Sequence, residues 1–129
     1  MPLGAGTFTL TGQDVDLDIF ETLAVTVQST AYGNKYFIDG SETPTLNLYE
    51  GSTYRFDQSD SSNSGHPIRF STTSDGSHGG GSEYTTGVTT NGTPGNAGAY
   101  TQIVVASSAP TLYYYCTNHS GMGGQANTP

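Results

Sequence analysis

Apolar and polar residues alternate with a period of two through most of the chain, and this alternation restricts the fold more than any other feature. Successive side chains of a β-strand point to opposite faces, so each alternating run predicts a strand with one buried face. The alternating apolar residues are Phe8 and Leu10; Leu23, Val25 and Val27; Leu46, Leu48, Tyr54 and Phe56; Ile68 and Phe70; Ile103 and Val105. The sequence therefore predicts an all-β protein.

Residues that favour turns separate these runs. Gly33, Gly40, Gly51, Gly76 and Gly92 each stand beside Asn, Asp or Glu, and glycine adopts positive φ without steric cost. The least periodic stretch, residues 71–99, is expected to cross between two sheets. Residues 14–21 leave two interpretations open, because their apolar positions fit one helical turn as well as a strand.

Length and charge limit the functions that the chain can have. With 129 residues and 33% hydrophobic content, we expect one domain with a modest core. Eleven acidic residues against three basic ones give a formal charge of −8, which disfavours binding to nucleic acid phosphates or to an anionic membrane surface. No apolar run approaches the ~18 residues of a membrane-spanning helix. We expect neither a nucleic acid nor a membrane as partner.

The single cysteine, Cys116, is followed at short intervals by His119 and Met122. A lone cysteine leaves no partner for a disulfide, a thioredoxin-like motif or a zinc ribbon. One thiolate, two imidazoles and a weak axial thioether are instead the ligand set of mononuclear blue copper centres. This spacing predicts a metal site that still needs a second histidine.

Two other histidines are available for that position. His66 precedes the alternating run at Ile68 and Phe70, where a strand can carry it to the same end of the fold, whereas His78 stands in a glycine-rich loop and is interpreted as an exposed side chain. We therefore predict that His66, Cys116, His119 and Met122 hold one copper ion. The alternative, an empty site in which Cys116 is a small buried apolar residue, stays open.

The pattern C-x-x-H-x-x-M resembles the ligand loop of the cupredoxin family, with the spacing found in amicyanin, and the neighbouring residues also look like the plastocyanin loop. Residues 46–56 are similar to the strand, glycine turn and strand that precede the first ligand histidine in this family. The resemblance implies a Greek-key β-sandwich over residues 32–129, preceded by residues 1–31 as an N-terminal arm or extra strands.

The same resemblance concerns the residues next to the ligands. Thr117, directly after the cysteine, matches the Ser or Thr usual there in cupredoxins. Many members place Asn after the first ligand histidine, and its backbone N–H helps to hold the thiolate. Here that position is Pro67, which has no N–H. The hydrogen bonding around the sulfur is therefore expected to differ from the family pattern.

A second resemblance concerns residues 6–14 and 54–67, which look like segments of virion and tail-associated proteins of marine bacteriophages. It implies a displayed structural module of a phage virion, with other virion or surface structural proteins as partners. The alternative from the copper loop is a soluble electron-transfer protein with a redox partner. With one mononuclear site and no recognisable order of Ser, His and Asp, we expect no enzyme activity.

The first residues bear on where the protein is expected to be. They carry no basic flank and no apolar run of signal-peptide length. We expect synthesis in the cytoplasm without a signal peptide, followed by a place on a virion or an extracellular surface.

Overall fold

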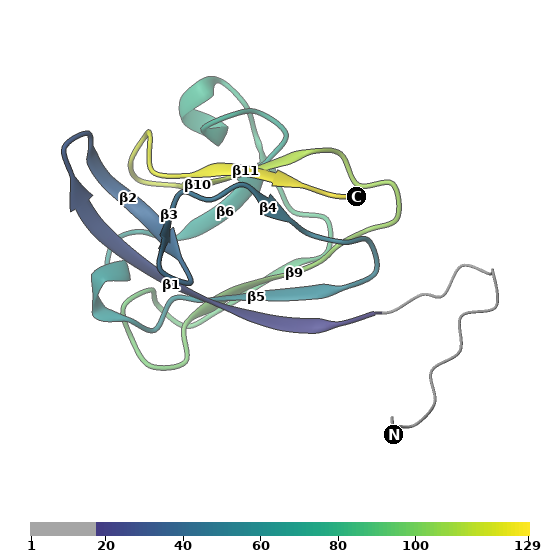
Figure 1. Ribbon diagram of the computed structural model, residues 1–129, viewed down its shortest axis with the longest axis horizontal. Helices are drawn as coiled ribbons and strands as arrows, with labels where there is room; N and C mark the ends of the chain where they lie inside the picture. The colour runs from purple at the N-terminus through teal and green to yellow at the C-terminus, as the bar shows by residue number, and fades with distance from the viewer. Residues whose placement is uncertain (1–17) are drawn as a thin grey trace.

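The computed structural model describes residues 18–129, which form two β-sheets stacked as two layers (Figure 1). The six-stranded sheet has the order β3-β2-β1-β5-β9-β8, and the five-stranded sheet has the order β4-β11-β10-β6-β7. The first sheet consists of β1 (Phe20–Thr30), β2 (Gly33–Ile38), β3 (Ser41–Glu42), β5 (Thr53–Asp57), β8 (Val88–Asn91) and β9 (Tyr100–Val104). The second consists of β4 (Leu46–Asn47), β6 (Ile68–Ser71), β7 (Glu83–Tyr84), β10 (Leu112–Cys116) and β11 (Gly124–Asn127).

Both sheets are mixed. In the six-stranded sheet β1 runs parallel to β5, and in the five-stranded sheet β4 runs parallel to β11, while the other neighbouring pairs are antiparallel. Two short 3-10 helices complete the described elements, η1 (Ser61–Asn63) and η2 (Gly76–Gly79). The prediction of an all-β protein is confirmed.

The core lies between the two layers and is built from the alternating residues. Tyr54 and Phe56 point inward from β5, and Ile68 and Phe70 point inward from β6. The rings of Phe56 and Phe70 meet edge to face with their centroids 5.3 Å apart, so they link the two sheets directly. Burying alternate residues of both sheets is what stabilises this arrangement.

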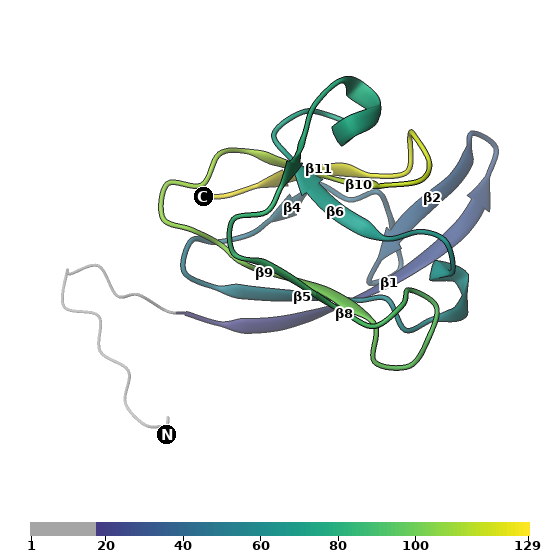
Figure 2. The same cartoon turned by 180° about the vertical axis from the view of Figure 1, so that it is seen from behind.

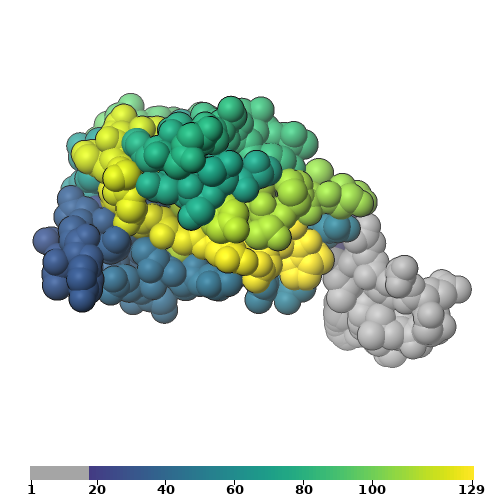
Figure 3. All heavy atoms as spheres, turned by 90° about the horizontal axis from the view of Figure 1, so that it is seen from above, coloured from purple at the N-terminus to yellow at the C-terminus, as the bar shows by residue number. Residues whose placement is uncertain are grey.

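The crossing predicted for residues 71–99 is confirmed. β7 lies at the edge of the five-stranded sheet and β8 at the edge of the six-stranded one, so the chain changes layers between them (Figure 2). Before this crossing, η2 packs against β10 and β6, and in Figure 3 its segment lies over the five-stranded sheet. Gly76 has a φ of +55°, and a Cβ there would lie 2.5 Å from the ring of Tyr115. Only glycine fits this contact.

The N-terminal segment of residues 1–31 is described from residue 18 onward. Its residues 20–30 form β1, which lies between β2 and β5 and buries Leu23 and Val25. Of the ambiguous stretch 14–21, Phe20 and Glu21 begin this strand. The alternating pair Phe8 and Leu10 lies outside the described residues.

No helix within residues 18–129 is long and apolar enough to cross a lipid bilayer.

Candidate metal centre

The register of two strands brings the first predicted ligands together. Cys116 is the last residue of β10, and its partner in the antiparallel neighbour β6 is Ile68, the first residue of that strand. His66 precedes Ile68 by two residues, so it lies at the end of the sheet where β6 begins and β10 ends. The segment that carries His66 and the loop after β10 lie at the same end of the molecule (Figure 1).

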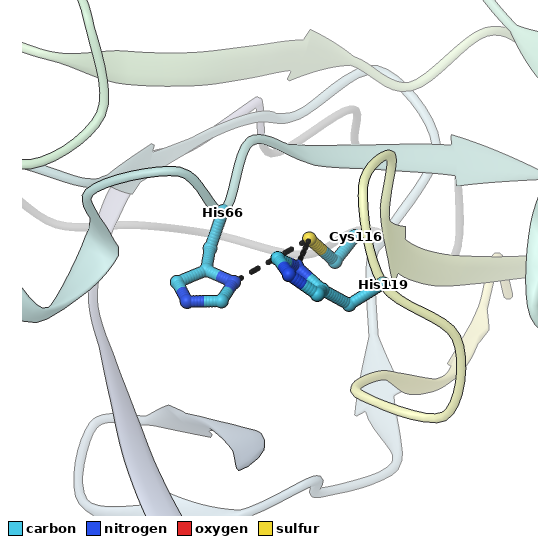
Figure 4. A group of neighbouring side chains, drawn as sticks. All are labelled: His66, Cys116 and His119. Carbon is cyan, nitrogen blue, oxygen red and sulfur yellow. Dashed lines mark hydrogen bonds between the residues drawn. The ribbon is translucent and has the colours of Figure 1, made fainter.

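Three predicted ligands converge at this end, as Figure 4 shows. The sulfur of Cys116 lies 3.7 Å from Nδ1 of His66 and 3.6 Å from Nδ1 of His119. Each of the three residues offers a ligand atom within 4.8 Å of the others. Metal bonds of ~2.3 Å to sulfur and ~2.05 Å to nitrogen, at tetrahedral to trigonal angles, would separate sulfur and nitrogen by roughly 3.6–3.8 Å. The group could therefore hold a metal ion without a change in the separation of its sulfur and nitrogen atoms.

The thiol alone does not account for this arrangement. A thiol has one weak hydrogen to donate, and two imidazole nitrogens face the same sulfur. At 3.6 and 3.7 Å both contacts are long compared with ordinary hydrogen bonds. A cation between the three atoms would satisfy all of them at once, so the donor set fits a metal better than it fits a thiol hydrogen bond.

The loop after β10 places His119 beside Cys116. Gly121 adopts a φ of +77°, and its N–H donates to the carboxylate of Asp75 at 2.9 Å. Its carbonyl accepts a hydrogen bond of 2.6 Å from Nζ of Lys35. The glycine-rich loop is thus fixed from both sides, by the turn before η2 and by β2.

Two further hydrogen bonds join the segment of His66 to the segment of Cys116 and His119. The N–H of Thr117 donates to the carbonyl of Pro67 at 3.2 Å, and Nδ2 of Asn118 donates to the carbonyl of Gly65 at 3.0 Å. Pro67 and Thr117, predicted beside the ligands, are therefore bonded to each other through the backbone. Pro67 contributes its carbonyl as the acceptor and has no N–H to donate to the sulfur.

Behind the ligands lies a buried polar network that the sequence did not reveal. Nε2 of Gln58 donates to the carbonyl of His66 at 2.8 Å and to Oδ1 of Asn63 at 2.9 Å. Oε1 of Gln58 accepts from the N–H of Ile68 at 3.0 Å, and the hydroxyl of Tyr36 donates to the carbonyl of His66 at 2.6 Å. The network fixes the backbone on both sides of Pro67.

Burial and charge differ among the three ligands. Cys116 is fully buried, His66 is half-buried and His119 is exposed. Burial and then the charge of the neighbouring His119 lower the pKa of His66. Both causes favour the neutral imidazole, which is the form that binds metals. The centre is buried at its sulfur and reaches the surface through His119.

The other two candidates, Met122 and His78, have different contacts. Met122 is buried in the same core cluster as Cys116, and its carbonyl accepts a hydrogen bond of 2.9 Å from the N–H of Tyr36. His78 is exposed, as predicted, and one of its ring nitrogens lies 2.8 Å from the carbonyl of Cys116. His78 thus contacts the backbone of a ligand residue and stands outside the His66, Cys116 and His119 group.

No model of a known protein family matches the chain, and no curated protein matches it either. Conclusions about its function therefore depend on the geometry of this centre.

Proposed function

We propose that the protein is a copper-binding β-sandwich that holds one ion through His66, Cys116 and His119, with the thioether of Met122 as a weak axial ligand. The observation that carries this proposal is the spacing of the three ligand atoms, 3.6 and 3.7 Å from sulfur to each nitrogen. Met122 is supported by its position three residues after His119 and by its burial in the same core cluster as Cys116.

Copper is favoured over other metals by the chemistry of the donors. Divalent copper binds a given site of nitrogen and sulfur ligands more tightly than the other first-row divalent ions do, and a thiolate with a thioether also suits monovalent copper. Zinc takes a cysteine with two histidines as well, but its catalytic sites complete a tetrahedron with water. A buried thioether at the fourth position is typical of electron-transfer copper centres.

A titration with copper sulfate tests this proposal. The wild-type protein should take up one equivalent of Cu(II) and develop an intense visible band from charge transfer between thiolate and copper. Cys116→Ser should lose the band, because Cys116 is the single cysteine of the chain and no other thiolate can replace it. A wild-type protein that stays colourless and takes up no stoichiometric copper would leave only the fold.

For the role of the copper protein we propose a displayed structural module of a phage virion, with a Greek-key sandwich of cupredoxin type as the rigid unit. Its support is the resemblance of residues 54–67 to virion proteins, together with a negative surface that keeps such a module soluble. The protein should co-sediment with virions that are purified from the native source. Recovery of the protein only in the virion-free fraction would refute this role.

A soluble electron carrier is the second candidate, and one observation favours it. His119 is exposed while Cys116 is buried, so the centre has an imidazole edge at which a redox partner could approach. A carrier should exchange electrons rapidly between its Cu(I) and Cu(II) forms, which NMR line broadening in mixed samples measures. Slow exchange would favour the structural module.

A further inference from the structure

One residue of β2 holds both segments that carry ligands. The N–H of Tyr36 donates to the carbonyl of Met122 at 2.9 Å, and its hydroxyl donates to the carbonyl of His66 at 2.6 Å. β2 belongs to the six-stranded sheet, whereas His66 and Met122 flank strands of the five-stranded sheet. In Figures 1 and 2 the hairpin of β1 and β2 reaches toward the loop after β10, which agrees with these contacts.

The phenol of Tyr36 is deeply buried. Burial raises its pKa most, and the charge of Cys116 raises the pKa further. Tyr36 is fully buried in the core cluster that contains Cys116. Its hydroxyl therefore keeps its proton and remains a hydrogen-bond donor.

The carbonyl of His66 does not depend on Tyr36 alone. A carbonyl oxygen accepts two hydrogen bonds, and Nε2 of Gln58 supplies the second at 2.8 Å. Loss of the Tyr36 hydroxyl therefore leaves that carbonyl one partner, so the hydroxyl can be removed without leaving a buried acceptor unpaired.

We infer that Tyr36 is a positioning residue of the metal centre, whose hydroxyl and N–H hold the His66 and Met122 segments in place. This inference rests on the proposed copper function and adds what orients the ligands. Hydrogen bonds outside the ligand set that orient the ligands of a copper centre tune its reduction potential. Removal of the hydroxyl should therefore change the potential.

Tyr36→Phe tests the inference, with Tyr114→Phe as its matched control. Tyr114 is also a buried tyrosine whose hydroxyl donates to a backbone carbonyl, that of Pro44 at 2.7 Å. Both variants should bind one equivalent of Cu(II). Tyr36→Phe should have a changed reduction potential and a shifted thiolate-to-copper band, and Tyr114→Phe should keep both at wild-type values. A Tyr36→Phe protein with the wild-type potential and band would overturn the inference.

A second measurement needs no variant and no copper. In NMR spectra of the metal-free wild type, the hydroxyl proton of Tyr36 should exchange slowly with water and lie close to protons of His66. Rapid exchange of this proton would overturn the inference. Absence of copper uptake by the wild type would instead refute the proposed function, while the metal-free spectrum would still report whether Tyr36 positions His66.

Discussion

Gln58 is the residue whose side chain most directly supports the fold around the centre, and Gln58→Met tests this. Methionine has a similar length and is compatible with a buried site, but it makes none of the hydrogen bonds of the amide. The substitution removes the partners of the Ile68 N–H and of Oδ1 of Asn63, whereas the carbonyl of His66 keeps Tyr36. Two buried polar groups are therefore left unsatisfied.

The expected loss follows from that count. Each buried polar group without a partner costs about 1–3 kcal/mol, so the two together should lower the free energy of unfolding by roughly 2–6 kcal/mol. For a domain of this size a change of 1 kcal/mol shifts the melting temperature by about 4 °C, which predicts a fall of roughly 8–24 °C. Thermal unfolding of the metal-free protein, followed by circular dichroism, measures it.

Gln125→Met is the matched control. Gln125 is exposed and makes one side-chain hydrogen bond, to Asn127 at 2.8 Å, so the same substitution there should change the free energy of unfolding by no more than about 0.5 kcal/mol. If Gln58→Met melts within about 2 °C of the wild type, the buried network does not support the His66 segment as described.

Three further outcomes are expected. Met122→Leu should keep copper and shift its reduction potential, whereas His66→Ala should weaken copper binding by roughly 100-fold or more, because an imidazole is a strong equatorial ligand and a thioether a weak axial one; equal losses in a copper titration would contradict this geometry. The metal-free protein should lose stability as the pH falls below about 6.5, because the pKa of His66 is lowered in the folded state and the unfolded chain then binds more protons. Melting temperatures of the wild type and His66→Gln across this range check it, and equal pH slopes would exclude His66 as the cause. Deletion of residues 1–31 should unfold the protein, since it removes β1 from between β2 and β5; a truncated chain with native NMR dispersion would show that β1 is dispensable.

Much of the fold could be predicted because burial and alternation have the same cause. Residues such as Leu23, Phe56 and Ile103 alternate in the sequence since one face of each strand packs into the core. β2 was not among the predicted runs, although Tyr36 and Ile38 alternate between two turn signals. Its run is short and contains few apolar residues, so the pattern is weak there.

The grouping of His66, Cys116 and His119 could be predicted better than the residues that support it. Cys116 and His119 are close in sequence, and His66 precedes a recognisable strand, so residue type and spacing sufficed; Met122 as a fourth ligand stays a prediction. Gln58 and Tyr36 act through backbone groups of distant segments. Such contacts depend on how the two sheets pack, and neither residue type nor spacing indicates them.

X-ray absorption at the copper edge, on protein loaded with one equivalent of Cu(II), tests the central claim most directly. The proposed centre predicts a first shell with one short bond to sulfur and two bonds to imidazole nitrogens, and Cys116→Ser should lose the sulfur contribution. A first shell of nitrogen and oxygen alone in the wild-type protein would contradict the proposal that His66, Cys116 and His119 hold the ion.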